Sequence, residues 1–278
     1  MVSGATTREE VCKEIREYWK KEWSQEEGDR AIKVQSARET LIEPLARHMY
    51  GKDFKKWDEE QYKEGMIKAF KKARGACGVD GFAGEEIANL PEGVAAKFYE
   101  VTKKWRKNRR TPAIMKYILQ CALPKPGKEA KVENLRLLSI FLAFWRTFEA
   151  SSLKTKSFEE WKTAVGMKDV AWKESAEEMA AVIATVFDEY GFLGALDYSK
   201  AYDKMAPEVS GEAMIASGVD EDLVRTLQDV WTQQRRFVAF DGHLSKEELQ
   251  TSDAHPQRGP MGCCGYAVID DWWDCKYQ

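Results

Sequence analysis

The sequence predicts a helix-rich α+β protein with a small, mostly antiparallel sheet. Most of the chain repeats apolar residues at the three-to-four-residue spacing of an amphipathic helix. Four segments instead favour strands, because they are short or end in turn signals; they are residues 115–128, 192–198, 235–240 and 249–253. Helical stretches separate these segments along the chain, which indicates a sheet bracketed by helices.

The first half of the chain is mainly helical. Residues 1–60 read as charged helical segments, an N-terminal extension of unknown role. The next helix, residues 59–75, ends in basic residues and a glycine, which is a common helix stop. A turn-rich stretch at 75–91 leads into a basic helix at 93–108, and Pro112 breaks the chain before the first strand.

The second half combines buried helices with short strands. We expect one apolar helix over residues 134–156, and another that begins with a capping box formed by Ser175 and Glu178. Pro207 suits the first turn of a later helix. A helix over 220–234 then leads into the third strand and a turn.

Composition indicates an intracellular globular protein, in the cytoplasm or nucleus, that is not secreted. Hydrophobic residues make up 44% of the 278 residues and charged residues 32%, which is typical of a folded domain. No apolar run approaches the roughly 20 residues that cross a bilayer, so no membrane partner is expected. The charged N-terminal residues contain no signal-peptide core. The six cysteines have no regular spacing, so we expect no disulfide framework.

A local excess of positive charge contrasts with the net charge of −3. Residues 101–136 contain eleven Lys or Arg residues and two acids. Because clustered cations bind phosphates, the densest part predicts a nucleic-acid surface made of Lys103, Lys104, Arg106, Lys107, Arg109 and Arg110. The alternative is an ordinary solvated helix end.

The stretch GALDYSKAYDKM, residues 194–205, contains the main candidate catalytic residue. Asp197 lies near the end of the apolar segment 192–198. The carboxyl end of a buried strand is a common position for a ligand-binding carboxylate. An aspartate there also commonly begins a turn, so the residues alone leave both interpretations open.

LDYSKAYDKM resembles the first catalytic motif of reverse transcriptases: an apolar pair, Asp, variable residues, Ala, an aromatic and Asp. Three other stretches resemble motifs of that family, and all four stand in its order. ALPKPGK followed by LRLLSIFLAFWRTFE is similar to the fingers segment. GACGVDGF resembles the Gly- and Asp-rich turn that opens the domain in retrotransposon and group II intron enzymes. HPQRGPMGC resembles the Pro-Gln-Gly motif, so the resemblance covers about residues 60–278.

The resemblance implies the fingers and partial palm of a right-hand polymerase. Residues 61–156 would be the fingers-like region, and residues 157–278 the partial palm with the first catalytic motif and the grip motif. The implied activity is RNA-directed DNA polymerisation, with an RNA template, a DNA primer and deoxynucleoside triphosphates as partners. Two Mg²⁺ ions would be the cofactors, because this reaction uses them to activate the nucleophile and neutralise the leaving group.

The resemblance also assigns roles to residues of the palm. Asp197 would be the catalytic metal ligand, and the backbone carbonyl of Tyr198 would add an oxygen. Tyr202 matches the aromatic that lies under the nucleotide sugar, although in isolation it would be read as a core aromatic. Gln257 matches the residue near the nucleotide and the template strand.

Two cations of the fingers-like region complete the implied site. Lys125 and Arg136 match the residues that grip the triphosphate, the lysine as a point charge and the arginine as a planar fork. Without the resemblance, both would be read as ordinary surface cations.

The sequence departs from the family at three places, one of which is Gly262-Cys263, where Ser-Pro is usual. Arg258 stands where a glycine is usual, and a side chain there obstructs a close backbone approach. No aromatic-x-Asp-Asp motif is recognisable, because Asp270 and Asp271 follow Gln257 too closely and are expected to be helix-surface acids. We therefore expect a truncation before the second catalytic motif, and no polymerase activity from this chain alone.

Two alternatives remain open from the sequence. One is a non-catalytic, reverse-transcriptase-like scaffold that binds nucleic acid; it would tolerate Asp197→Asn, whereas catalysis would not. The other is an acidic helical protein with no nucleic-acid role, which would fail to bind a primer–template at any salt concentration.

Overall fold

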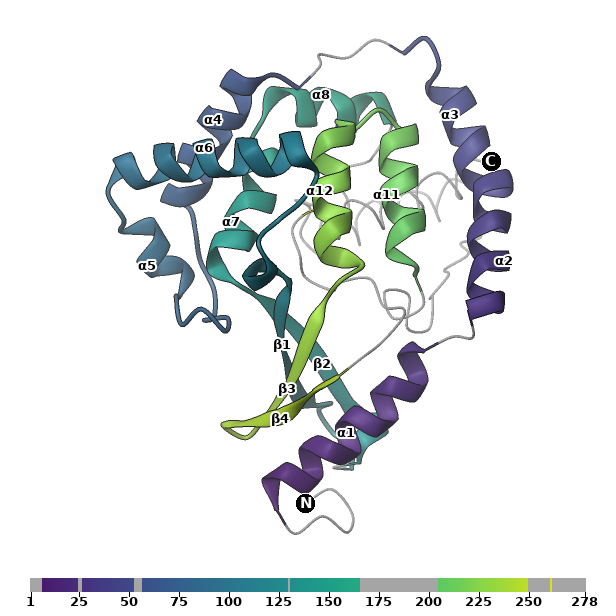
Figure 1. Cartoon of the computed structure of the whole chain (residues 1–278), viewed down its shortest axis with the longest axis vertical. Coiled ribbons are helices and arrows are strands. Elements are labelled where there is room, and N and C mark those ends of the chain that lie inside the picture. The colour runs from purple at the N-terminus through teal and green to yellow at the C-terminus, as the bar shows by residue number, and fades with distance from the viewer. Residues whose placement is uncertain are drawn as a thin grey trace, which may run out of the picture.

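A computed structural model describes residues 7–24, 27–52, 57–129, 131–165, 205–249 and 261 of the chain. The described helices other than the first form a body at one end of a four-stranded sheet, and the sheet extends away from it (Figure 1). The α+β class predicted from the sequence is confirmed. No helix among the described residues is long and apolar enough to cross a membrane.

The sheet is mixed. Its strands are β1 (Tyr117–Pro124), β2 (Leu135–Phe141), β3 (Arg235–Phe240) and β4 (His243–Leu249), in the spatial order β2-β1-β3-β4. The two outer pairings are antiparallel, and the central pairing of β1 with β3 is parallel. A parallel pairing needs a long crossover connection, and here β2 and several of the described helices lie between the two strands in the sequence.

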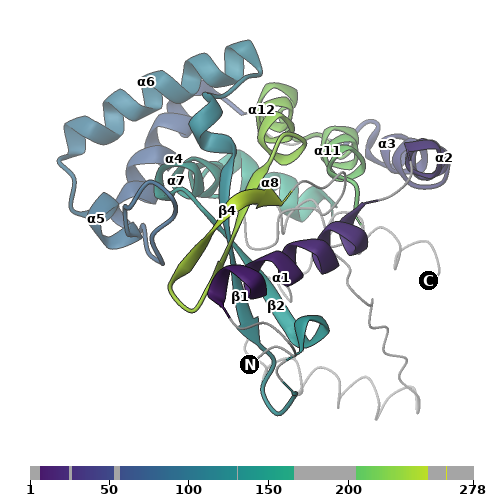
Figure 2. The ribbon, with the colours of Figure 1, turned by 60° about the horizontal axis from the view of Figure 1, so that its bottom comes forward.

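The first helix, α1 (Arg8–Trp23), covers one face of the sheet (Figure 2). Thr7 and Glu10 form a capping box at its start. Its buried residues share a hydrophobic cluster with all four strands; the cluster includes Ile15, Trp19, Trp23, Ala122, Leu137, Val238 and Leu249. The apolar face of the amphipathic helix α1 is therefore buried by packing on an apolar face of the sheet.

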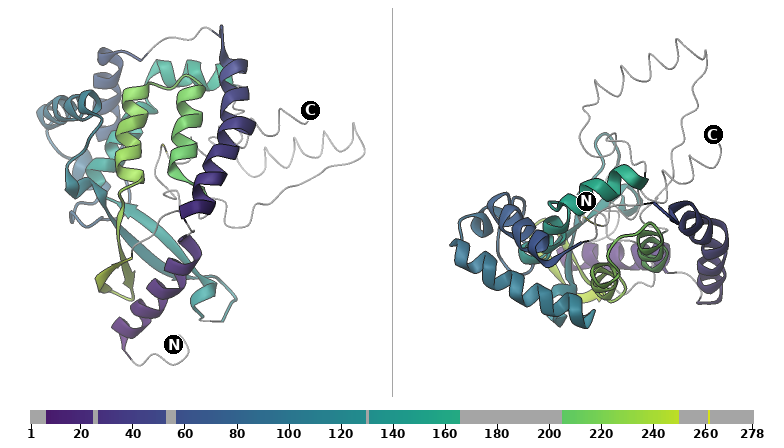
Figure 3. Two further views of the ribbon diagram at one scale, coloured as in Figure 1. Left: turned by 45° about the vertical axis from the view of Figure 1, so that its right-hand side comes forward. Right: turned by 90° about the horizontal axis from the view of Figure 1, so that it is seen from above.

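The next helices form an arm at the edge of the helical body (Figure 3). α2 (Glu27–Ala37) continues through a π-helical turn (Arg38–Ile42) into α3 (Glu43–Met49). The arm packs on α11 (Pro207–Ala216). Two ion pairs cross this contact, Arg30 with Glu208 and Arg38 with Glu212, both with N–O distances of 2.7 Å.

The remaining helices enclose the main core. They are α4 (Glu59–Lys71), α5 (Gly84–Ala88), α6 (Glu92–Asn108), α7 (Ala143–Ser152), α8 (Lys156–Val165) and α12 (Glu221–Trp231). Trp145, Phe148, Trp161 and Trp231 are among the largest side chains buried between them. α4 and α7 cross closely at Gly65, where an added Cβ would lie 2.3 Å from the carbonyl oxygen of Ser151.

Two sequence predictions are wrong in position. The apolar segment 134–156 was expected to be one helix, but it begins with β2 and only then forms α7. Leu135 and Leu137 are buried and Arg136 between them is exposed, which is the two-residue period of a strand. The strand after the Asp241-Gly242 turn, β4, begins at His243, before the predicted start near 249; residues 250–253 lie outside the described residues. The predicted helix from Ser175 and the strand 192–198 lie outside the described residues.

Candidate nucleotide and nucleic-acid interface

The β1–β2 hairpin brings Lys125 and Arg136 together. Arg136 lies opposite Leu123 in the strand register, and the backbone N–H of Lys125 donates to Asn134 at 3.0 Å, which continues the ladder by one pair. Because side chains alternate along a strand, Leu123, Lys125 and Arg136 belong to the same face of the hairpin. Diagonal neighbours of this kind lie roughly 7–8 Å apart, so both cations can contact one triphosphate.

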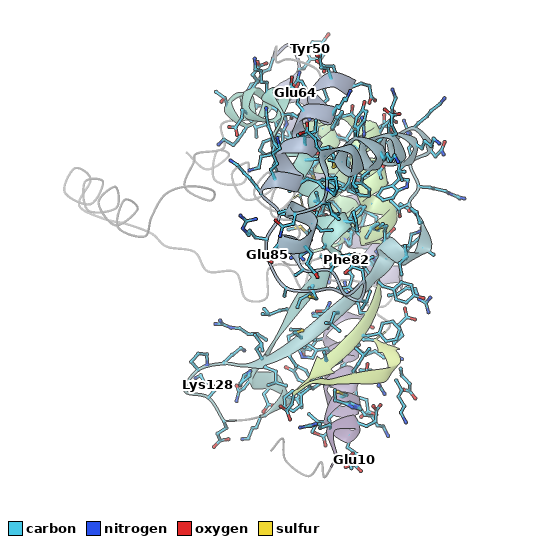
Figure 4. The ribbon with its side chains drawn as sticks, turned by 90° about the vertical axis from the view of Figure 1, so that its left-hand side faces the viewer. Glu10, Tyr50, Glu64, Phe82, Glu85 and Lys128 are labelled. Atoms are coloured by element: carbon cyan, nitrogen blue, oxygen red, sulfur yellow. The ribbon has the colours of Figure 1, made fainter. Side chains whose placement is uncertain are left out.

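Neither cation is neutralised within the described part of the chain. Arg136 is exposed and forms no ion pair there, and the Nζ of Lys125 contacts only the carbonyl oxygen of Glu133, at 3.4 Å. The connecting turn uses Gly127 with a φ of 70°, which favours glycine. Lys128, beside this glycine, lies at the end of the hairpin, away from the helical body (Figure 4). The hairpin therefore presents available positive charge.

The two cations lie at the end of a partly exposed sheet face, opposite the face that α1 covers. Alternation places Leu119, Cys121, Leu138 and Ile140 on the same face as Arg136, and all four are only partly buried. Leu123 next to them is 46% exposed. An apolar surface edged by cations fits a ligand that has both rings and phosphates.

The turn GACGVDGF docks onto the junction between β2 and α7. The Oδ2 of Asp80 accepts a hydrogen bond at 2.9 Å from the backbone N–H of Ala143, the first residue of α7. In the other direction, Arg146 donates to the carbonyl oxygens of Ala76 at 2.6 Å and Arg74 at 3.3 Å. Gly78 lies so close that an added Cβ would be 2.7 Å from the carbonyl oxygen of Phe141. Two stretches that resemble separate motifs thus form one structural unit.

Most residues of the predicted nucleic-acid surface are exposed to solvent. Lys103, Lys104 and Lys107 are exposed along the second half of α6, and Arg110 is exposed just after it. Arg109 is also exposed, but its guanidinium is held by Asp222 at 2.7 Å and Glu221 at 3.3 Å. Part of the positive charge of this stretch is therefore cancelled by α12.

For Arg106 the surface prediction is wrong. Its side chain is 6% exposed and donates to both oxygens of Glu59, at 2.9 and 3.2 Å, while its guanidinium lies 3.7 Å from the ring centroid of Tyr62. Burial alone would raise the pKa of Glu59, but hydrogen bonds from Tyr99 and Arg106 outweigh it and lower the pKa. Arg106 connects α6 to α4 and is not available to phosphates.

A buried acid on α7 was missed by the sequence reasoning. Glu149 is fully buried, and its Oε1 accepts a hydrogen bond at 3.3 Å from the indole N–H of Trp231. The backbone of Met261 also donates to this carboxyl group. Burial raises the pKa of Glu149 to about 8, so the acid is largely neutral at physiological pH. A lone Glu in the apolar stretch FWRTFEASS was the available signal.

The predicted palm residues Asp197, Tyr198, Tyr202 and Gln257 lie outside the described residues. Among the residues that the structure does describe, no group of three or more His, Cys, Asp or Glu side chains is arranged to hold a metal ion.

The sequence matches no model of a known protein family, and a search of the curated proteins returns no match.

Proposed function

We propose that this chain is a fingers and partial-palm region of reverse-transcriptase type, which binds an RNA template, a DNA primer and a deoxynucleoside triphosphate. The observation that carries the proposal is the position of Lys125 and Arg136 on one face of a hairpin. The same hairpin continues through β2 into α7, where the Asp80 turn docks. The stretch that resembles the fingers segment and the turn that resembles the opening of the domain therefore lie in one unit.

In this proposal the hairpin cations act electrostatically. Lys125 supplies a compact positive charge and Arg136 a planar pair of N–H donors, and together they orient the triphosphate. Asp197 would hold Mg²⁺, which when bound supplies charge neutralisation at the reacting phosphate. The exposed lysines of α6 would contact the nucleic-acid backbone and add affinity without sequence preference.

Primer–template binding tests the proposal. The full chain should bind an RNA–DNA primer–template with an affinity that falls steeply as salt rises, because counterions are released on binding. Substituting Lys103, Lys104 and Lys107 together by Gln should flatten that salt dependence. Failure to bind at any salt concentration would instead favour the acidic helical protein with no nucleic-acid role.

Catalysis is a separate question from binding. We propose that the 278-residue chain extends a primer only at background level, because its sequence contains no recognisable second Asp-Asp motif. Robust incorporation with Mg²⁺ that Asp197→Ala abolishes would contradict this part of the proposal. The alternative function, a non-catalytic scaffold, predicts that Asp197→Asn leaves every measured property unchanged.

A further inference from the structure

A second positively charged site lies on the helical body, apart from the hairpin. It is a cavity of about 340 Å³ between α4, α7 and the start of α5. Four cations line it, together with six small residues; the cations are Lys72, Arg74, Arg146 and Lys154, and the small residues are Ala69, Ala73, Gly84, Ala143, Thr147 and Ala150. The small side chains keep the cavity open, and the long cationic ones surround it.

The charge of this cavity is unbalanced. No acidic residue lines it, and none of its four cations forms an ion pair within the described part of the chain. The nearest acids are engaged with backbone: Glu85 accepts from the N–H of Gly75 at 3.4 Å, and Asp80 from that of Ala143 at 2.9 Å. Both act on Arg146 only through their fields. The four cations outnumber these two acids, so an anion in the cavity would meet a net positive potential.

Arg146 is the most constrained of the four cations. Two of its N–H groups are held by backbone carbonyl oxygens of the turn, and its Nε is buried without a hydrogen-bond partner. Burial also lowers the pKa of Arg146. These contacts fix the guanidinium beside the cavity, where its positive charge attracts a phosphate.

A neighbouring cavity limits where an anion can bind. It has a volume of about 240 Å³ and is lined by Asp58, Glu60 and Glu64 as well as by lysines. Lys154 belongs to both cavities. Because the acids repel phosphate, an anion is confined to the cationic side of Lys154.

We propose that the cavity between α4, α7 and α5 binds a backbone phosphate of a single-stranded nucleic acid. The identity of the strand rests on the proposed function, whereas anion binding rests on the cavity itself. A volume of about 340 Å³ accommodates a phosphodiester with its sugar. The strand would run over the helical body, away from the hairpin, and lengthen the footprint of the protein on nucleic acid.

The test is the binding of a fluorescent single-stranded RNA of about 20 nucleotides by the full chain, titrated at several salt concentrations. The double variant Lys72→Gln, Lys154→Gln removes two exposed cations of the cavity. It should lose about tenfold in affinity at roughly 0.1 M salt and about one unit in the slope of log K against log salt. The matched control, Lys68→Gln with Lys71→Gln, removes the same amount of charge from the last turn of α4, outside this cavity, and should bind nearly as the wild type does.

Binding of inorganic phosphate shows whether the ligand of the cavity is a nucleic-acid strand or a free anion. Calorimetry with inorganic phosphate should show no saturable binding below millimolar concentrations for the wild type or either double variant. A wild type that binds RNA no better than the cavity variant overturns the site. Saturable phosphate binding that the cavity variant loses, with RNA binding unchanged or absent, overturns the assignment to a strand. If wild-type RNA binding persists in the cavity variant but fails in a variant of the α6 lysines, the proposed function survives and this inference does not.

Discussion

Asp80 caps α7 from a distance of 63 residues in the sequence, because its carboxylate accepts a hydrogen bond from the backbone N–H of Ala143 at 2.9 Å. A residue in the turn thereby satisfies one of the N–H groups that every helix start leaves unpaired, and its negative charge matches the helix dipole. Arg146 on α7 donates to Ala76 in the same turn and to Arg74 just before it. The turn and the helix are therefore expected to fold together.

Removing this cap should weaken the fold. We expect Asp80→Ala to lower the free energy of unfolding by about 1 kcal/mol, as loss of a helix cap does. Asp80→Asn keeps an acceptor and should cost less than half of that. Urea unfolding followed by circular dichroism measures both variants. Equal stability of Asp80→Ala and the wild type would show that the cap contributes nothing.

Arg106 and Lys104 should separate stability from nucleic-acid binding. Arg106→Ala leaves Glu59 without its main partner and opens space beside Tyr62, so we expect a loss of about 2 kcal/mol in unfolding free energy. Lys104→Ala changes an exposed side chain and should shift stability by less than about 0.5 kcal/mol.

The effects of these two substitutions on RNA affinity should be in the opposite order to their effects on stability. Lys104→Ala should weaken RNA binding at low salt, whereas Arg106→Ala, measured at a temperature where it is folded, should bind as the wild type does. Chemical unfolding and fluorescence anisotropy provide the two readouts. A stable Arg106→Ala variant that has lost RNA affinity would contradict this assignment and would indicate that Arg106 contacts nucleic acid.

Glu149 should make stability depend on pH. The unfolded chain releases this proton near pH 4.5, whereas the folded protein keeps it until about pH 8. The unfolded state therefore binds fewer protons between these values, and stability falls by up to about 1.4 kcal/mol per pH unit as pH rises.

Glu149→Gln isolates this effect because the amide keeps an acceptor for the Trp231 indole and cannot ionise. The variant should be progressively more stable than the wild type from pH 5 to 8. Urea unfolding at each pH measures the difference. A difference that stays constant with pH would contradict a neutral buried acid.

The contact between α1 and β4 should weaken in acid. A hydrogen bond from His243, with an Nε2–Oε2 distance of 2.7 Å, is the main reason why the pKa of Glu9 is lowered. A lowered carboxyl pKa stabilises the fold above its ordinary value near 4.5, and this stabilisation is lost as pH falls through the lowered value. Because Trp19 and Trp23 belong to the buried face of α1, their fluorescence should change in this range. Glu9→Gln should remove the part of the change that is due to this contact.

Local pattern was sufficient for some elements and not for others. The strand 235–240, with its Asp-Gly turn, was predicted with its observed bounds, because β-branched and aromatic residues next to a turn have few alternatives. The segment 134–156 was misassigned because Leu135 and Leu137 fit a buried helix as well as a strand. Only pairing with β1, which is a non-local contact, decides between them.

The candidate site shows the same division. Lys125 and Arg136 were identified from motifs, and the hairpin brings them to one face. The structural role of Arg106 could not be predicted from the sequence. Its partner Glu59 lies 47 residues earlier, and a run of charges does not show which cations form ion pairs. The cationic cavity was missed for a similar reason, since its residues come from three helices.

The most direct test of the account is whether a matched nucleotide is held by the hairpin. A primer–template with a dideoxy-terminated primer is bound by the full chain, and its dissociation is followed with Mg²⁺ and either the complementary or a mismatched deoxynucleoside triphosphate. The account predicts that the complementary nucleotide slows dissociation by about tenfold, equivalent to about 1.4 kcal/mol. Lys125→Gln with Arg136→Gln should abolish this effect, and Lys128→Gln at the hairpin end should preserve it. Equal dissociation rates with both nucleotides, or an unchanged response in the double variant, would contradict the account.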